Sequence, residues 1–437
     1  MKGGSYIKNK EVLRKSKAEK KKMIKTKTYE NGLKLIVETL EDFRSVAVGI
    51  MVGAGSSRET AEENGISHFI EHVNFKGTAT RTAFDISDEL EGVGAIVNAY
   101  TAKDMTCYYV KCTDERVKQS FAVLSDIFLN STYPEDELDK ERGVVIEEIN
   151  MIEDTPDELC IDALAEAYFG KSGYGATILG PVENAARFKK SDVLAYKNKH
   201  YTPDNIVVSF AGNISFEAAE ELMNEYFGGF LSGAPAGKSG LYMPEITQKW
   251  GRVAIEKPIE QAHIAIGVPA AKSGDDDKYP LLLVNSVLGG GMSSRLFQSV
   301  REKSGLAYTV YSYVSLYKEV GVTYLYAAVN AKKSHAAYQK LLDEMRLLSE
   351  KGITAKELER AKEQIKGSTI LSGESTSSYM TSNGKRLLLF NQIFNVDDEL
   401  KKISAVTLDK ANEVAAKYFS PEKRAAAIVG KNVKPLD

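Results

Sequence analysis

The chain has 437 residues, of which 43% are hydrophobic and 27% are charged, and its formal net charge is -3. This length favours two domains. The near-neutral charge gives no strong field for nucleic acid, and no apolar run approaches the roughly 18 residues of a membrane span, so we expect neither nucleic acid nor a membrane as a partner.

Residues 1–26 are rich in lysine and lack the apolar stretch of a secretory signal. Transit peptides are rich in Arg and Ser and poor in acidic residues, and this segment fits neither condition, so we expect a solvated basic tail. Cys107, Cys112 and Cys160 form no C-x-x-C pair, which is typical of free thiols in a reducing compartment. Together these features predict a cytoplasmic protein without a signal peptide.

Strand-like and helix-like segments follow one another in both halves of the chain. Apolar and β-branched runs predict strands at 46–52, 95–100, 106–112, 206–211, 263–268, 308–314 and 322–328. Helical spacing of apolar residues predicts helices at 64–75, 84–90, 115–130, 134–152, 278–288, 334–349 and 354–371. Consecutive strands are separated by short turns and the helices cluster after them. This order favours an α+β fold with largely antiparallel sheets over a doubly wound parallel sheet.

The second half of the chain repeats features of the first. Segment 137–142 (ELDKER) is echoed by 357–362 (ELERAK), and 201–212 is echoed by 419–430, at offsets of about 220 and 218 residues. Between the copies lies a stretch rich in Gly, Ser and Ala that predicts a linker. We therefore predict a tail (1–26), a first domain (27–230), a linker (231–244) and a homologous second domain (245–437).

Segment 68–72 (HFIEH) carries the strongest chemical signal. On a helix, His68 and His72 lie one turn apart on one face, where two imidazoles can bind one metal ion, most often zinc. Glu71 lies beside them, in the inverse order of the H-E-x-x-H zinc protease motif. Taken alone, the pattern is equally compatible with a solvated polar face that holds two incidental histidines. The opposite face carries an apolar stripe at helical spacing: Ile66, Phe69, Ile70 and Val73.

The predicted helix 134–152 offers a third ligand, because a catalytic zinc site typically has three protein ligands. Glu148 and Glu141 are seven residues apart and lie close to the expected apolar ridge, whereas Glu147 points away from it. Glu148 is therefore the better ligand, and Glu141 is a candidate to support a ligand from behind. From spacing alone, a surface glutamate on a charged helix remains the simpler interpretation. At the matching positions the second half has Ser368 and Ala361, and it has no H-x-x-E-H.

Segment 63–78 (ENGISHFIEHVNFKGT) resembles the active-site region of the pitrilysin-like inverzincin peptidases, family M16. Within that family it most resembles the short, two-domain members, which are bacterial processing proteases and the β subunit of mitochondrial processing peptidase. These members carry the third ligand in a V-V-x-E-E-I-like segment about 76 residues after the second histidine, and segment 144–149 (VVIEEI) puts Glu148 there. Val73 and Asn74 depart from the residues common in relatives, but they flank the ligand set.

The resemblance implies two homologous domains that enclose a substrate chamber and hold one Zn²⁺ per chain. It implies that His68, His72 and Glu148 bind the metal and that Glu71 activates the attacking water. The strand with Asn98 and Ala99 is similar to the family's edge strand that pairs with substrate backbone. Segment 301–308 resembles an element whose arginine and tyrosine reach the active site from the other domain, so Arg301 and Tyr308 are expected to bind substrate, and Tyr308 to stabilise the oxyanion.

From these expectations the chain is a zinc metalloendopeptidase that cleaves short or unfolded peptides. Because it carries both the metal motif and the Arg/Tyr element, we expect a homodimer. A heterodimer with a related subunit is a second possibility, since some family pairs divide these elements. The alternative function is a non-catalytic or heteromer-dependent scaffold subunit of a processing peptidase complex.

Overall fold

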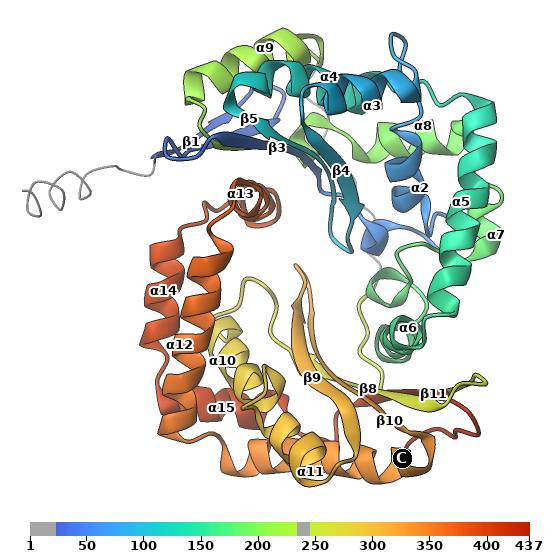
Figure 1. The fold of residues 1–437 in the computed structure, drawn as a ribbon, viewed down its shortest axis with the longest axis vertical. Coiled ribbons are helices and arrows are strands. Elements are labelled where there is room, and N and C mark those ends of the chain that lie inside the picture. The colour runs from blue at the N-terminus through green and yellow to red at the C-terminus, as the bar shows by residue number, and fades with distance from the viewer. Residues whose placement is uncertain (1–22, 234–244) are drawn as a thin grey trace, which may run out of the picture.

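The computed structural model describes residues 23–233 and 245–437. They form two mixed sheets, one from each half of the chain, with helices packed against both (Figure 1). In this view the first half, from blue to green, lies above the second half, from yellow to red. The predicted α+β class with two similar halves is confirmed.

The first sheet has the strand order β1-β2-β6-β3-β5-β4. Its neighbouring strands are antiparallel except for the pair β2 and β6. The central strands β3 and β6 are apolar and almost fully buried, whereas β4 lies at an edge of the sheet. The strands are β1 (Met23–Thr28), β2 (Lys34–Thr39), β3 (Ser45–Val52), β4 (Ile96–Thr101), β5 (Thr106–Thr113) and β6 (Ile206–Gly212).

The second sheet repeats this plan with the order β7-β11-β8-β10-β9, and only β7 and β11 are parallel. β11 therefore takes the place that β6 has in the first sheet, as the sequence repeat requires. β9 is an edge strand with an irregularity in its register at one end. The strands are β7 (Arg252–Glu256), β8 (Gln261–Ala270), β9 (Ala307–Leu316), β10 (Gly321–Asn330) and β11 (Ala425–Gly430).

Each half contributes one helix to the sheet of the other half. Helix α6 (Pro156–Phe169) belongs to the first half, but its Cys160 and Leu164 are fully buried against the second sheet. Helix α13 (Thr376–Phe390) belongs to the second half, but its Met380 is buried against the first sheet (Figure 1). Each half thus covers one face of its own sheet and leaves the other face to a helix of the opposite half. Periodicity identified apolar faces but carried no information about which sheet covers them.

The remaining helices surround the sheets. In the first half they are α2 (Ile66–Val73), α3 (Ala83–Gly92), α4 (Val117–Asn130), α5 (Glu135–Glu153), α7 (Val182–Ala185), α8 (Lys190–His200) and α9 (Phe216–Leu231). In the second half they are α10 (Lys278–Gly289), α11 (Ser334–Lys351), α12 (Ala355–Ser372), α14 (Val396–Ala405) and α15 (Leu408–Tyr418). Every strand and helix predicted above is present, and its ends differ by at most two residues. Among the elements that the sequence analysis did not single out are β1, β2, β7, α6, α8, α9, α13, α14 and α15.

The predicted tail and linker only partly fall on described residues. β1 pairs Met23 with Thr39, so the first sheet begins inside the segment 1–26 that we predicted as a tail, and residues 1–22 lie outside the described part. Helix α9 ends at Leu231, and residues 234–244 of the predicted linker are not described either. All three cysteines are free and buried.

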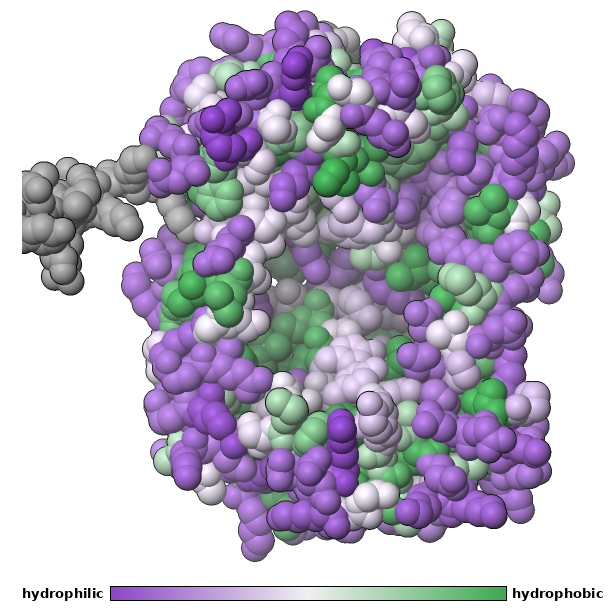
Figure 2. Space-filling model, viewed as in Figure 1, coloured by the Kyte–Doolittle hydropathy of each residue, from purple (hydrophilic) through white to green (hydrophobic). Residues whose placement is uncertain are grey.

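The molecule is hollowed between its two halves, and the hollow exposes pale and green side chains (Figure 2). A pocket of about 370 Å³ lies between the halves, lined by Ile152 and Asp157 of the first half and by Tyr311 and Tyr313 of β9, with other residues of the first half. Within residues 23–233 and 245–437, none of the helices has the length and apolar character needed to cross a membrane.

Candidate metal centre

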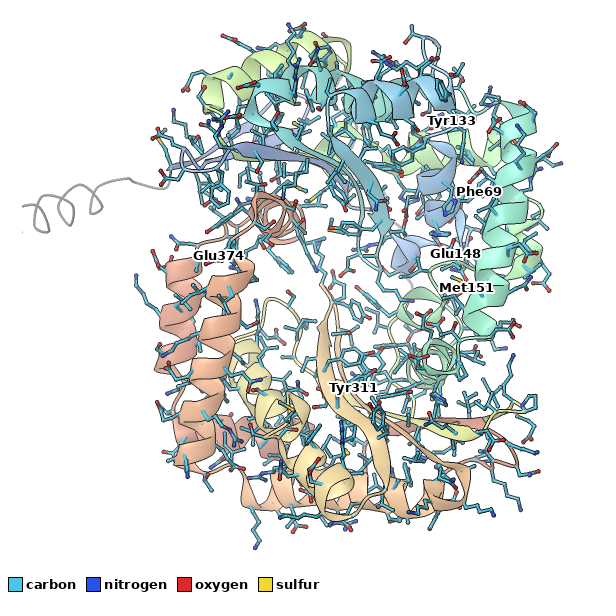
Figure 3. The ribbon with its side chains drawn as sticks, in the orientation of Figure 1. Phe69, Tyr133, Glu148, Met151, Tyr311 and Glu374 are labelled. Carbon is cyan, nitrogen blue, oxygen red and sulfur yellow. The ribbon has the colours of Figure 1, made fainter. Side chains whose placement is uncertain are left out.

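Helix α2 presents two different faces, as the sequence predicts. Ile66, Phe69, Ile70 and Val73 are buried in the core of the first half, and Figure 3 shows Phe69 on this helix beside α5. The opposite face turns His68 and His72 towards α5. Burial of the apolar stripe thus fixes the rotation of the helix about its axis.

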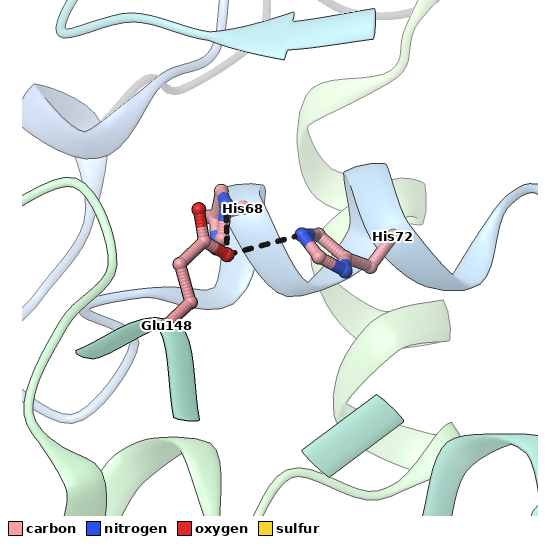
Figure 4. Close-up of side chains that lie close together, drawn as sticks. All are labelled: His68, His72 and Glu148. Atoms are coloured by element: carbon pink, nitrogen blue, oxygen red, sulfur yellow. Dashed lines mark ion pairs between the residues drawn. The ribbon is translucent and has the colours of Figure 1, made fainter. Parts of the chain in front are cut away.

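His68, His72 and Glu148 meet between α2 and α5 (Figure 4). Glu148 Oε2 lies 3.5 Å from His68 Nε2 and 3.4 Å from His72 Nε2, and one possible ligand atom from each residue lies within 4.8 Å of the others. On α5, Glu147 is exposed whereas Glu148 is half-buried, which agrees with the helical-face argument. Two imidazole nitrogens and a carboxylate oxygen are the donor types that zinc prefers.

The protonation of the site suits a cation. Burial, with a contribution from the neighbouring His72, lowers the pKa of His68 to about 4, so its ring is neutral and offers a lone pair at pH 7. Burial also lowers the pKa of His72, but its hydrogen bond with Glu141 and the charges of Glu148 and Glu141 outweigh burial and raise that pKa. The surroundings of His72 therefore stabilise positive charge, which a metal dication would supply in place of a proton.

Glu141 orients His72 from behind. Glu141 shares one face of α5 with Glu148 and is buried. Its Oε2 lies 3.1 Å from His72 Nδ1. Lys76 Nζ lies 2.7 Å from the other oxygen. Burial raises the pKa of Glu141, but the hydrogen bonds with His72 and Lys76 outweigh it and lower the pKa. The ionised carboxylate accepts the Nδ1 proton and leaves the Nε2 lone pair facing Glu148.

Glu71 lies on the same helix and is held by β4. Thr101 Oγ1 donates a 2.6 Å hydrogen bond to Glu71 Oε2. Burial raises the pKa of Glu71, although the bond from Thr101 opposes the shift, so this carboxylate is a better proton acceptor than an exposed one. The roles of Thr101 and Lys76 were not predicted, since neither contact follows from a spacing along the chain.

The C-terminal end of α2 is fixed by a half-buried lysine. Tyr133 Oη donates to Asn74 Oδ1 at 2.7 Å, and Lys197 Nζ lies 2.5 Å from Tyr133 Oη and 3.1 Å from the carbonyl oxygen of Phe128. Figure 3 shows Tyr133 beside this end of the helix. No carboxylate forms an ion pair with Lys197 in the part of the chain that the structure describes. Burial lowers the pKa of Lys197 to about 7.

This lysine should make the stability of the protein depend on pH. A lysine in the unfolded chain keeps its proton to about pH 10.4, whereas folded Lys197 loses it near pH 7. The unfolded state therefore binds more protons between these values, and the free energy of unfolding rises with pH by up to about 1.4 kcal/mol per unit. We expect Lys197→Met to lack this rise in urea unfolding at pH 7.5, 8.5 and 9.5 with chelator present. Exposed Lys199→Met is the matched control, and equal slopes for wild type and Lys197→Met would contradict the expectation.

The edge strand β4 offers the predicted substrate-binding residues. β4 pairs with β5 along one side, and its position at the end of the strand order leaves the other side without a strand partner among the described residues. Asn98 is exposed and Ala99 is buried. Through Thr101, the same strand contacts Glu71, so a peptide added to β4 would lie next to the candidate metal centre.

Arg301 and Tyr308 lie together but away from the histidines. Arg301 is on a π-helical segment, η5 (Phe297–Lys303), and its guanidinium carbon lies 4.9 Å from the centre of the Tyr308 ring. Tyr308 is the residue skipped in the pairing of β9 with β10, and it is 73% exposed. No contact joins either residue to His68, Glu71, His72 or Glu148 within the described ranges. On β9, Tyr311 and Tyr313 rather than Tyr308 line the pocket between the halves, and Figure 3 shows Tyr311 across the hollow from Glu148.

Two helix-covered sheets around a hollow, with two histidines and a glutamate gathered on one half, define a two-domain protein with a candidate metal centre. Residues 34–182 match the family described as insulinase (peptidase family M16), and residues 187–365 match the peptidase M16 inactive domain. The chain is 42% identical to an uncharacterized zinc protease of Bacillus subtilis, over 93% of this chain and 98% of that protein. It is 37% identical to one of Streptomyces coelicolor, over 90% and 86%. The chain belongs to peptidase family M16.

Solved structures share the fold at lower identity. A protease from Helicobacter pylori matches with a TM-score of 0.86 and 22% identity, over 93% of this chain and 99% of that chain. A peptidase M16 inactive domain from Pseudomonas fluorescens matches with a TM-score of 0.85 and 21% identity, over 95% and 100%. A chain of Complex III2 from Candida albicans matches with a TM-score of 0.81 and 18% identity, over 93% and 96%. These likenesses establish the fold alone.

Proposed function

We propose that this protein is a zinc metalloendopeptidase that hydrolyses short or unfolded peptides. The observation that carries the proposal is the meeting of His68, His72 and Glu148 within 4.8 Å, with Glu71 on the same helix. The printed names of the bacterial relatives as zinc proteases support it. The site fits one Zn²⁺ per chain because its donors are two imidazoles and a carboxylate, with His72 oriented by Glu141.

In this proposal a zinc ion held by His68, His72 and Glu148 would polarise the scissile carbonyl and make a water more acidic. Glu71 accepts the proton of the attacking water and then passes it to the leaving amine. Its hydrogen bond with Thr101 orients the carboxylate, and burial makes it more basic. Asn98 and Ala99 bind the peptide backbone as an added strand. Backbone pairing tolerates many sequences, so side-chain pockets and the size of the hollow would set specificity.

We further propose that the enzyme acts as a homodimer in which Arg301 and Tyr308 of one subunit complete the site of the other. The motivation is their position: Tyr308 is exposed on the edge strand β9, Arg301 packs against its ring from η5, and neither residue contacts the metal ligands of its own chain. Tyr308 would donate a hydrogen bond to the oxyanion, and Arg301 would bind substrate backbone or carboxylate. A heterodimer with a related subunit is the other arrangement that such a division allows.

Mixing two inactive variants tests this arrangement. We expect Glu71→Gln and Arg301→Ala each to be nearly inactive alone, and an equilibrated mixture to recover up to about a quarter of wild-type activity. The reason is that half of the dimers would be mixed, and each mixed dimer would hold one intact site. A mixture of Glu71→Gln with His68→Ala is the control, since both changes lie in the metal half. Lack of recovery in verified mixed dimers would contradict a shared site.

The experiment that tests the function itself combines metal analysis with cleavage of a peptide library. Zinc near one per chain and chelator-sensitive cleavage are expected. The fold is shared with a chain of Complex III2 from Candida albicans, which keeps a scaffold subunit as the second candidate. Zinc near zero and no cleavage, alone or with a related subunit, would favour that candidate.

A further inference from the structure

Helix α2 has no cap of its own at the end that leads into His68. The N-cap position is Gly65, with φ of 98° and no side chain. A Cβ built on Gly65 would lie 2.3 Å from the carbonyl oxygen of Leu179. Ser, Thr, Asp and Asn, the usual N-cap residues, therefore do not fit here, and the first amides of the helix need an acceptor from elsewhere.

Glu59 supplies that acceptor. Its Oε1 accepts a 2.8 Å hydrogen bond from the amide of Ser67, and its Oε2 accepts one of 2.8 Å from the amide of Gly65 and one of 3.1 Å from Asn64 Nδ2. Glu59 is 2% exposed. No ion pair with Glu59 is found within residues 23–233 and 245–437. Burial raises the pKa of Glu59, and the hydrogen bonds from Ser67, Gly65 and Asn64 oppose that shift. The carboxyl group is thus held by amide donors at the positive end of the helix dipole.

The two histidines are oriented by different means. The ring of His72 is held through Nδ1 by Glu141. The Nδ1 atom of His68 is buried and has no hydrogen-bond partner among the described residues. The direction of the His68 ring therefore depends on its backbone and packing. Ser67, whose amide donates to Glu59, is the residue directly before His68.

We propose that Glu59 is the positioning residue of α2, the helix that carries His68 and His72 (the metal helix). Its carboxylate accepts hydrogen bonds from the amides of Gly65 and Ser67 and so holds the first turn of α2 in the position from which His68 Nε2 faces Glu148. The inference rests on the proposed function because it takes zinc as the bound metal. It assigns to Glu59 the role for His68 that Glu141 has for His72.

Zinc affinity, measured by chelator competition, tests the proposal together with the visible spectrum of the cobalt-substituted protein. Glu59→Gln should raise the Kd for zinc by about 10- to 100-fold, the range typical of residues that orient ligands, because its amide nitrogen would oppose one of the two backbone donors. The cobalt absorption bands should shift, since the ligand geometry changes. Glu59→Asp keeps the charge but is shorter by one methylene, and it should also weaken binding, which covers the case in which Glu59→Gln does not fold.

Two control variants separate positioning from other effects. Exposed Glu62→Gln, from the same loop, should leave zinc affinity and the cobalt spectrum unchanged. Leu341→Ala removes a fully buried side chain from the core of the second half and should lower thermal stability without changing the Kd for zinc. Wild-type affinity in Glu59→Gln and Glu59→Asp, or an equal loss in Leu341→Ala, would overturn the inference. Failure of the wild type to bind zinc would instead remove the proposed function and this inference with it.

Discussion

Glu71→Gln should lower kcat for peptide cleavage by about 10²- to 10⁴-fold, the range that general base catalysis contributes, while zinc content stays near one per chain. The amide of glutamine has the same shape as the carboxylate but does not accept the proton of the attacking water. Because Glu71 is not among the three proposed metal ligands, and because glutamine keeps an oxygen for the bond from Thr101, the site should remain intact. Steady-state kinetics and metal analysis of the same sample give the two values.

Glu147→Gln is the matched control for this change. Glu147 is an exposed glutamate on α5, directly before the proposed ligand Glu148, and its loss should leave both kcat and zinc content unchanged. Full activity in Glu71→Gln would exclude Glu71 as the base. Loss of zinc from that variant would mean that the carboxylate contributes to metal binding.

His68→Ala should remove both zinc and activity. Three protein ligands are typical of catalytic zinc, and the variant keeps only His72 and Glu148. Loss of a residue that only orients a ligand lowers metal affinity by about 10- to 100-fold. Loss of the ligand His68 should lower the affinity for zinc by more than this, so that zinc is lost on dialysis and cleavage falls below detection. Zinc added back in excess should restore little activity, because one donor is missing.

His335→Ala is the control for His68→Ala. His335 is exposed on α11 of the second half, so the same chemical change there should alter neither zinc content nor activity. If His68→Ala keeps its zinc after dialysis, the ligand set proposed here is wrong. Circular dichroism of both variants checks that the fold is retained.

The candidate metal centre was largely predictable because its chemistry is local. His68, Glu71 and His72 lie within one helical turn and a half, so the geometry of α2 alone puts them together. Glu148 followed from the rotation of α5 about its buried ridge, and Glu141 from its place seven residues earlier on the same face. Both positions agree with the structure.

The contacts that hold the centre were not predictable in this way. Thr101 bonds Glu71 from a neighbouring strand, Lys197 reaches Tyr133 beside the end of α2 from α8, and Glu59 reaches back over the first turn of the same helix. Each contact joins segments whose separation along the chain follows no helical or strand period. Their partners are defined only once the sheet and helices are packed.

By itself, the sequence determined the elements, the repeat of the two halves and the residues able to bind a metal, because these depend on side-chain chemistry and on periods of a few residues. Only the tertiary structure decided that α6 and α13 exchange sheets, that Glu59 caps the metal helix, and that Arg301 and Tyr308 lie away from the histidines of their own chain. These features depend on how apolar faces from distant segments cover one another. The free energy gained by hydrophobic burial depends on the apolar area that is covered and not on the sequence distance between the two surfaces. The apolar pattern of one segment therefore does not specify which segment packs against it.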